Sequence, residues 1–100
     1  MLVIGVEVNW TTRQGERAQE HAETEVVNAY GARLQMKGRA PPCGEIELRR
    51  PKIGQSTRAR VLEVSKRSPD GLTRVTVELE VPSESFWGVT IPPLPGAAAR

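Results

Sequence analysis

The clearest strand pattern in the chain covers residues 73–81. Apolar and polar side chains alternate there at period two, which is typical of a strand with one buried and one exposed face. The expected buried set is Val75, Val77, Leu79 and Val81, and the exposed set is Arg74, Thr76, Glu78 and Glu80. Just before this run, the sequence Ser-Pro-Asp-Gly at 68–71 combines a proline with a preset φ and a glycine that tolerates positive φ. The pattern predicts a hairpin between residues 57–65 and 73–81.

Three shorter runs also alternate. They contain Ile4, Val6, Val8 and Trp10 in the first, Ala32, Leu34 and Met36 in the second, and Ile46 and Leu48 in the third. Gly- and Pro-containing segments separate them, including a turn at 12–15 and a corner at 41–44. Short strands at regular spacing with such turns indicate a small antiparallel barrel or sandwich.

Residues 16–30 permit two interpretations. Ala18, Ala22, Val26 and Tyr30 follow each other at helical spacing, and Gly31 stands where a C-terminal cap falls. The apolar stripe of such a helix is thin, however, and a helix with so little burial is marginal. As a strand, the segment pairs with residues 3–10 through the turn at 13–15. The residues favour the strand, although propensity alone leaves both interpretations open.

Composition describes an ordinary single domain. The chain has 100 residues, of which 38% are hydrophobic and 26% charged. Only four residues are aromatic, so the core must be mostly aliphatic, and Trp87 is expected to close one end of it. Fourteen basic against twelve acidic residues give a net charge of +2, which is too small for a general attraction to polyanions. The basic clusters at 37–39, 49–52, 58–60 and 66–67 are expected to lie on solvated strand faces and turn edges, with a local anion pocket as the alternative.

The sequence lacks the residues that several classes of function require. The apolar runs are too short to span a bilayer, and no signal segment stands at the start. A single cysteine, Cys43, excludes an internal disulfide, and the single histidine, His21, leaves no zinc ligand set and no catalytic partner. We therefore expect a cytoplasmic protein without metal, cofactor, membrane insertion or enzymatic activity.

The stretch Thr24-Glu25-Val26-Val27-Asn28-Ala29-Tyr30-Gly31-Ala32-Arg33-Leu34 resembles the core segment of PilZ domains. In that family a strand ends at an Asp/Asn-x-Ser-x-x-Gly motif, and the next strand begins directly after the glycine. Residues 44–48, the pair 59–65 and 74–79, and the Phe-Trp-Gly-Val at 86–89 also look like elements of this family. The resemblance covers about residues 3–93, so we expect a PilZ-like domain over residues 1–93 and a C-terminal tail over 94–100.

The resemblance implies an all-β fold, namely a small antiparallel six-stranded PilZ-like barrel of the split-barrel type, and it favours a strand at 16–30. PilZ domains serve bacteria as receptors for the second messenger cyclic di-GMP, or as degenerate adapters that do not bind it. It also implies ligand-binding positions at Asn28, Gly31 and Arg33. Gly31 matches the motif glycine and Asn28 takes the serine position, whereas Val26 stands where the family has Asp or Asn.

The larger departure of this sequence from the PilZ family concerns the arginines of the ligand site. PilZ receptors carry an Arg-x-x-x-Arg motif just ahead of the first strand, because guanidinium groups grip phosphate and guanine. No arginine precedes the first predicted strand here. Arg13 and Arg17 match the spacing but lie in the predicted first turn, so we interpret the match as chance. Each lost charge-assisted contact costs about 1.5–3 kcal/mol, and every 1.4 kcal/mol is about tenfold in affinity.

These departures predict a degenerate PilZ-like signalling domain that acts as an adapter for an unidentified protein partner, with cyclic di-GMP binding weak or absent. A functional cyclic di-GMP receptor is the alternative. A small RNA- or single-stranded-DNA-binding barrel is a distant third, because the stacking aromatics are few and the net charge is slight.

Overall fold

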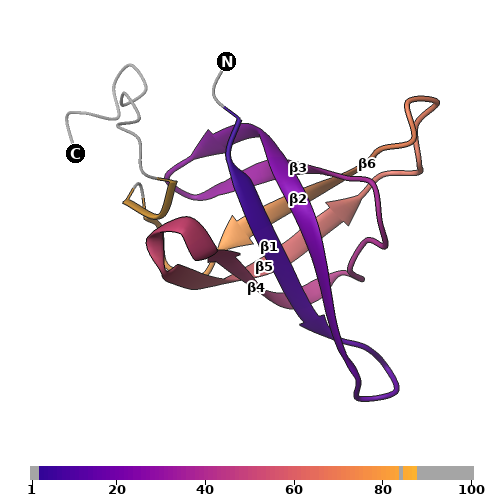
Figure 1. Ribbon diagram of the computed structural model, residues 1–100, viewed down its shortest axis with the longest axis horizontal. Helices are drawn as coiled ribbons and strands as arrows, with labels where there is room; N and C mark the ends of the chain where they lie inside the picture. Colours follow the sequence, from indigo (N-terminus) through magenta and orange to yellow (C-terminus); the bar gives the residue numbers. More distant parts are fainter. Residues whose placement is uncertain (1–2, 84, 88–100) are drawn as a thin grey trace.

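The described part of the chain, residues 3–83 and 85–87 of a computed structural model, is an antiparallel β-barrel (Figure 1). The elements are β1 (Gly5–Thr11), β2 (Arg17–Asn28), β3 (Gly31–Met36), β4 (Gly44–Arg50), β5 (Gln55–Val64) and β6 (Thr73–Leu79), with short 3-10 helices η1 (Pro51–Ile53) and η2 (Ser85–Trp87). The strands close in the order β1-β2-β3-β6-β5-β4. This confirms the predicted fold class of a small six-stranded antiparallel barrel.

Residues 17–28 form the strand β2, not a helix. β2 pairs with β1 from Gly5↔Glu23 to Thr11↔Arg17 and with β3 from Glu23↔Gln35 to Asn28↔Gly31. Its inward side chains are small: Ala18 and Ala22 are buried against the core. A strand between two partners gains its backbone hydrogen bonds from both, so this tertiary pairing overrides the helix propensity of the segment.

The core is built from alternate residues of all six strands, as the period-two pattern predicts. Its largest fully buried apolar side chains from the strands are Val6, Val8, Leu34, Met36, Leu48 and Val75. Trp87 is also fully buried, which confirms its predicted place at one end of the barrel. Its indole N–H donates to the carbonyl of Asn28 at 3.0 Å, and its ring lies edge-on to Phe86 with the centroids 4.9 Å apart. A guanidinium nitrogen of Arg50 donates to the Phe86 carbonyl at 2.8 Å and holds η2 in place.

The predicted hairpin after residue 57 is confirmed as β5 and β6. The N–H of Gly71, at φ 81°, donates to the carbonyl of Ser68 at 2.9 Å, so the predicted turn glycine does need positive φ. The extension of the buried alternation to Val81 was wrong, because β6 ends at Leu79 and Val81 is 71% exposed. The chain leaves the sheet there: the N–H of Ser83 donates to the carbonyl of Ala29 at 2.8 Å on its way to η2.

Two other predictions concern the ends of the chain. The first strand begins at Gly5, slightly later than the predicted residue 3. The predicted boundary between a domain at 1–93 and a tail at 94–100 lies outside the described residues. No helix among the described residues is long and apolar enough to cross a membrane.

Candidate functional site

Two β-bulges change which side chains reach the outer surface of the barrel. On β2 the register passes from Thr24↔Leu34 to Val26↔Arg33, so Glu25 is an extra residue. Without this shift, alternation would place Val26 inside with Ala22 and Thr24; instead Val26 is 58% exposed. On β5 the register passes from Val61↔Val77 to Glu63↔Thr76, so Leu62 is the extra residue, and it is 51% exposed. The β2 bulge therefore places Val26 on the outside. Leu62 follows the inward Val61 and lies outside by ordinary alternation, and the β5 bulge turns Val64 toward the core.

Val26 and Leu62 line the same shallow hollow, which holds about 390 Å³. We call this surface the bulged face and define it by residues from β2, β3, β6, β5 and the β2–β3 turn: Val26, Tyr30, Arg33, Leu62, Thr76 and Glu78. Tyr30, in the turn, is 66% exposed. The bulged face thus gathers three exposed apolar or aromatic side chains around one basic and one acidic group.

The Tyr30 turn is rigidly held. The carboxamide oxygen of Asn28 accepts the N–H of Tyr30 at 2.8 Å and the N–H of Gly31 at 3.0 Å, which is an Asx turn. The Tyr30 carbonyl accepts the N–H of Leu79 at 2.7 Å, which fixes the turn to β6. The exposed ring therefore projects from a backbone that is fixed on both sides.

The structure brings the three positions implied by the PilZ resemblance together, because Asn28, Gly31 and Arg33 all line the hollow of the bulged face. It does not bring Arg13 and Arg17 to them. Arg17 is the first residue of β2 and Asn28 the last, which separates them by about 36 Å along the strand at about 3.3 Å per residue. Arg13 lies in the turn beyond that far end.

Two of these positions have structural roles of their own. The Asn28 carboxamide oxygen already serves the turn. Gly31 lies opposite Glu78 on β6, and a Cβ atom at Gly31 would collide with the carbonyl oxygen of Val77. The close approach of β3 and β6 therefore requires glycine at this position whether or not a ligand binds.

Arg33 belongs to a chain of charges beside the bulged face. Its Nε lies 3.6 Å from Glu25 Oε1, while Glu25 Oε2 lies 3.5 Å from Arg74 Nε and accepts from Gln35 at 2.9 Å. Arg74 in turn bonds Asp70 at 3.0 Å. This hydrogen bond is the main cause that lowers the pKa of the Asp70 carboxyl and raises the pKa of Arg74. The guanidinium of Arg33 is thus partly neutralised, although its side chain is 53% exposed.

The arginines of the basic cluster at 58–60 face carboxylates. Arg60 on β5 lies opposite Glu45 on β4 and Glu78 on β6. Arg58 lies opposite Glu47. Such alternating rows are typical of a solvated sheet face.

Two more arginines near β4 are also engaged. The guanidinium of Arg49 lies 3.8 Å from Glu7, and Arg50 is bonded to the Phe86 carbonyl. The described parts of these clusters therefore resemble a charge-balanced surface more than an anion pocket.

Groups suited to metal binding or nucleophilic chemistry are scattered. Within 3–83 and 85–87, no three His, Cys, Asp or Glu side chains gather where they could hold a metal ion. His21 is exposed on β2, and Cys43 is an exposed free thiol in the loop before β4. Chemically, the bulged face provides an apolar and aromatic contact surface bordered by polar side chains.

Sequence reasoning missed Tyr30 and Leu62 as members of the site. A signal for Leu62 was present: Val61, Leu62 and Val64 break strict alternation, and such a break indicates a bulge. No family model, no curated protein and no solved structure matches this chain.

Proposed function

We propose that this barrel is a protein-interaction adapter whose partner docks on the bulged face. The observation that carries the proposal is the exposure of Val26, Tyr30 and Leu62 on one outer surface of the barrel. Burying apolar area contributes roughly 25 cal/mol per Å², and clustered exposed apolar side chains mark interaction sites more often than chance. Tyrosine is favoured at interfaces because its ring packs while its hydroxyl remains hydrogen-bonded.

The geometry of the turn supports the same proposal. Association loses less conformational entropy when the contact residues are held in place beforehand. Tyr30 meets this condition, since its N–H and its carbonyl are both engaged within the fold. Arg33 and Glu78 at the rim orient a partner that brings aliphatic or aromatic side chains to the centre.

A cyclic di-GMP receptor is less well supported as the function. Of the arginines weighed for the clamp, Arg13 and Arg17 lie at the far end of β2 from Asn28, and Arg33 is paired with Glu25. Glu78 in the same hollow repels phosphate. Membership of the PilZ family and a cytoplasmic setting stay predictions, and the adapter proposal is compatible with both.

Site-specific photo-cross-linking in the protein's own cells tests the proposal. A photoreactive amino acid replaces Leu62 in one variant and His21 in a matched control, because His21 is also exposed but lies outside the bulged face. We expect a discrete covalent adduct with one protein from position 62 and none from position 21. No adduct from position 62, or the same adducts from both positions, would contradict the proposal.

A further inference from the structure

The barrel has a second open feature at the seam between β1 and β4, away from the bulged face. These strands pair only through Glu7↔Arg49, Val8↔Leu48 and Asn9↔Glu47. Each strand is paired along its whole length with its other neighbour, β1 with β2 and β4 with β5. Among the described residues, the end of β1 and the beginning of β4 therefore have a partner on one side only.

The open main-chain groups can be identified from the alternation of hydrogen bonds. Main-chain groups of successive residues in an antiparallel strand point to opposite sides. The N–H of Thr12 donates to Glu16 in the β1–β2 turn and the Ile4 carbonyl accepts from Thr24, so even-numbered residues of this stretch point to β2. The odd-numbered residues point to β4, and Thr11 follows Asn9 in that row. By the same register, Glu45 is the next residue of β4 that points to β1.

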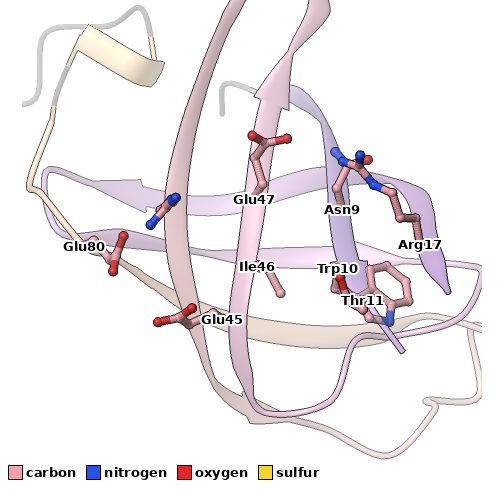
Figure 2. Close-up of a pocket in the computed structure, with 9 residues that line it drawn as sticks. Asn9, Trp10, Thr11, Arg17, Glu45, Ile46, Glu47 and Glu80 are labelled. Carbon is pink, nitrogen blue, oxygen red and sulfur yellow. The ribbon is translucent and has the colours of Figure 1, made fainter. Parts of the chain in front are cut away.

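A hollow of about 580 Å³ lies at this seam. Trp10 and Ile46, which are 8% and 5% exposed, provide its apolar floor. Figure 2 shows Glu45 and Glu80 at the left of the view, Glu47 near its centre and Arg17 at its right. Arg58, which lies opposite Glu47, also lines the hollow. The volume is in the range of roughly 300–1,000 Å³ that ligand pockets have.

One buried polar atom at the seam has no partner. The side-chain amide nitrogen Nδ2 of Asn9 is buried and makes no hydrogen bond within the described part of the chain. Asn9 is the last residue of β1 that pairs with β4, and it lines the hollow. A buried N–H without an acceptor is costly and rare in folded proteins, and a bound ligand is one way to supply the acceptor.

We propose that this seam accepts an extended peptide segment of a partner protein, which adds a short strand to the open edge of β4. A peptide backbone supplies what the seam lacks, because it pairs with the open main-chain groups of Thr11 and Glu45. Its carbonyls also offer an acceptor to the Asn9 amide when that side chain turns toward the hollow. Glu45, Glu47 and Glu80 line the hollow against Arg17 and Arg58, an excess of one carboxylate, so a segment with a Lys or Arg side chain is favoured over an acidic one. This inference goes beyond the adapter proposal and does not rest on the bulged face.

A random nine-residue peptide library displayed on phage and selected on the purified full chain tests the proposal. We expect enrichment of peptides containing Lys or Arg. Synthetic copies of them should bind at least about tenfold more weakly to Asn9→Leu and to Glu45→Lys, because each variant removes one recognised group. The matched control is Glu63→Lys, which makes the same charge change at an exposed residue that lies opposite Thr76 and lines neither hollow, and it should alter the affinity by less than about twofold.

Amide hydrogen exchange gives a second measurement that does not depend on the variants. In the free protein, the amides of Thr11 and Glu45 should exchange rapidly and those of Trp10 and Ile46 slowly. Bound peptide should protect Thr11 and Glu45. The proposal is overturned if selection yields no binder, if both seam variants bind the selected peptides as wild type does, or if protection appears elsewhere on the barrel.

Discussion

Individual residues in this barrel are constrained by packing as much as by any ligand. Gly31 is the clearest case, because the β3–β6 approach leaves no room for a Cβ atom beside the Val77 carbonyl. A motif resemblance and a steric requirement thus select the same residue. Asn28 behaves similarly, since its carboxamide closes the turn that presents Tyr30. Gly31 and Asn28 are therefore both required by the fold at these positions, independently of any ligand.

Replacing Gly31 by alanine should lower the free energy of unfolding by roughly 1–3 kcal/mol, because the strands must shift to admit the methyl group. Gly5→Ala is the matched control, since a Cβ there meets only the end of the movable His21 ring at 3.1 Å. We expect that control to change stability by less than about 0.5 kcal/mol. Urea unfolding measures both, and equal effects of the two substitutions would contradict this steric explanation.

The Asp70–Arg74 pair predicts a pH dependence. The hydrogen bond from Arg74 lowers the pKa of Asp70 below its ordinary 3.8 in the folded state. The pair therefore stabilises the fold fully above the unfolded pKa, and this stabilisation is lost as the pH falls through the lowered folded value. Asp70→Asn should be less stable than wild type near pH 6, and the difference should shrink toward pH 2. A difference that stays constant with pH would show that the pair is not its source.

At the scale of elements, regular period and turn chemistry predicted most of the barrel. Alternation and a Pro-Asp-Gly turn predicted the hairpin of β5 and β6. The strand β2 was favoured by its predicted pairing with residues 3–10, and in the structure it pairs on both sides. The two bulges were not predictable in the same way, because one inserted residue reverses the inward and outward assignment beyond it. On β2 this reversal places Val26 on the outer surface, where strict alternation with Ala22 and Thr24 would have placed it inside. The period-two pattern therefore predicts the inward or outward direction of side chains least well on the bulged face.

The short helix η2 should contribute strongly to stability despite its length. Trp87→Ala removes a fully buried indole and its hydrogen bond to Asn28, so we expect a loss of about 3–5 kcal/mol in the free energy of unfolding. Trp87→Phe keeps an aromatic ring but loses the hydrogen bond, and it should cost less. Chemical denaturation of the three proteins tests this order. A loss below about 1 kcal/mol for Trp87→Ala would mean that the barrel end is held by other contacts.

At the scale of the whole molecule, the outer surface divides into regions of different character. The bulged face lies over β2, β3, β6 and β5, and a charge-balanced row of Arg and Glu follows β4 and β5. The seam lies between β1 and β4. Figure 1 labels these strands. Asn28, Gly31 and Arg33, the positions implied by the PilZ resemblance, line one hollow because they flank the β2–β3 turn. Arg13 and Arg17 lie far from it, at and beyond the other end of the twelve-residue strand β2, in keeping with their predicted place in the first turn.

This division predicts the result of a titration with cyclic di-GMP. Without a cluster of free guanidinium groups at Asn28 and Gly31, we expect no saturable heat, or a dissociation constant weaker than about 100 µM. Isothermal titration calorimetry measures it. Binding in the low micromolar range would support the receptor instead, and its loss in Arg33→Ala would locate the ligand on the bulged face.

The affinity of the purified domain for the protein captured from position 62 tests the central claim most directly. Three proteins are compared: wild type, Leu62→Asp and His21→Asp. A charge buried at the centre of an interface is strongly unfavourable, so we predict at least about tenfold weaker binding for Leu62→Asp and less than about twofold change for His21→Asp. Equal affinity of all three proteins would contradict the account.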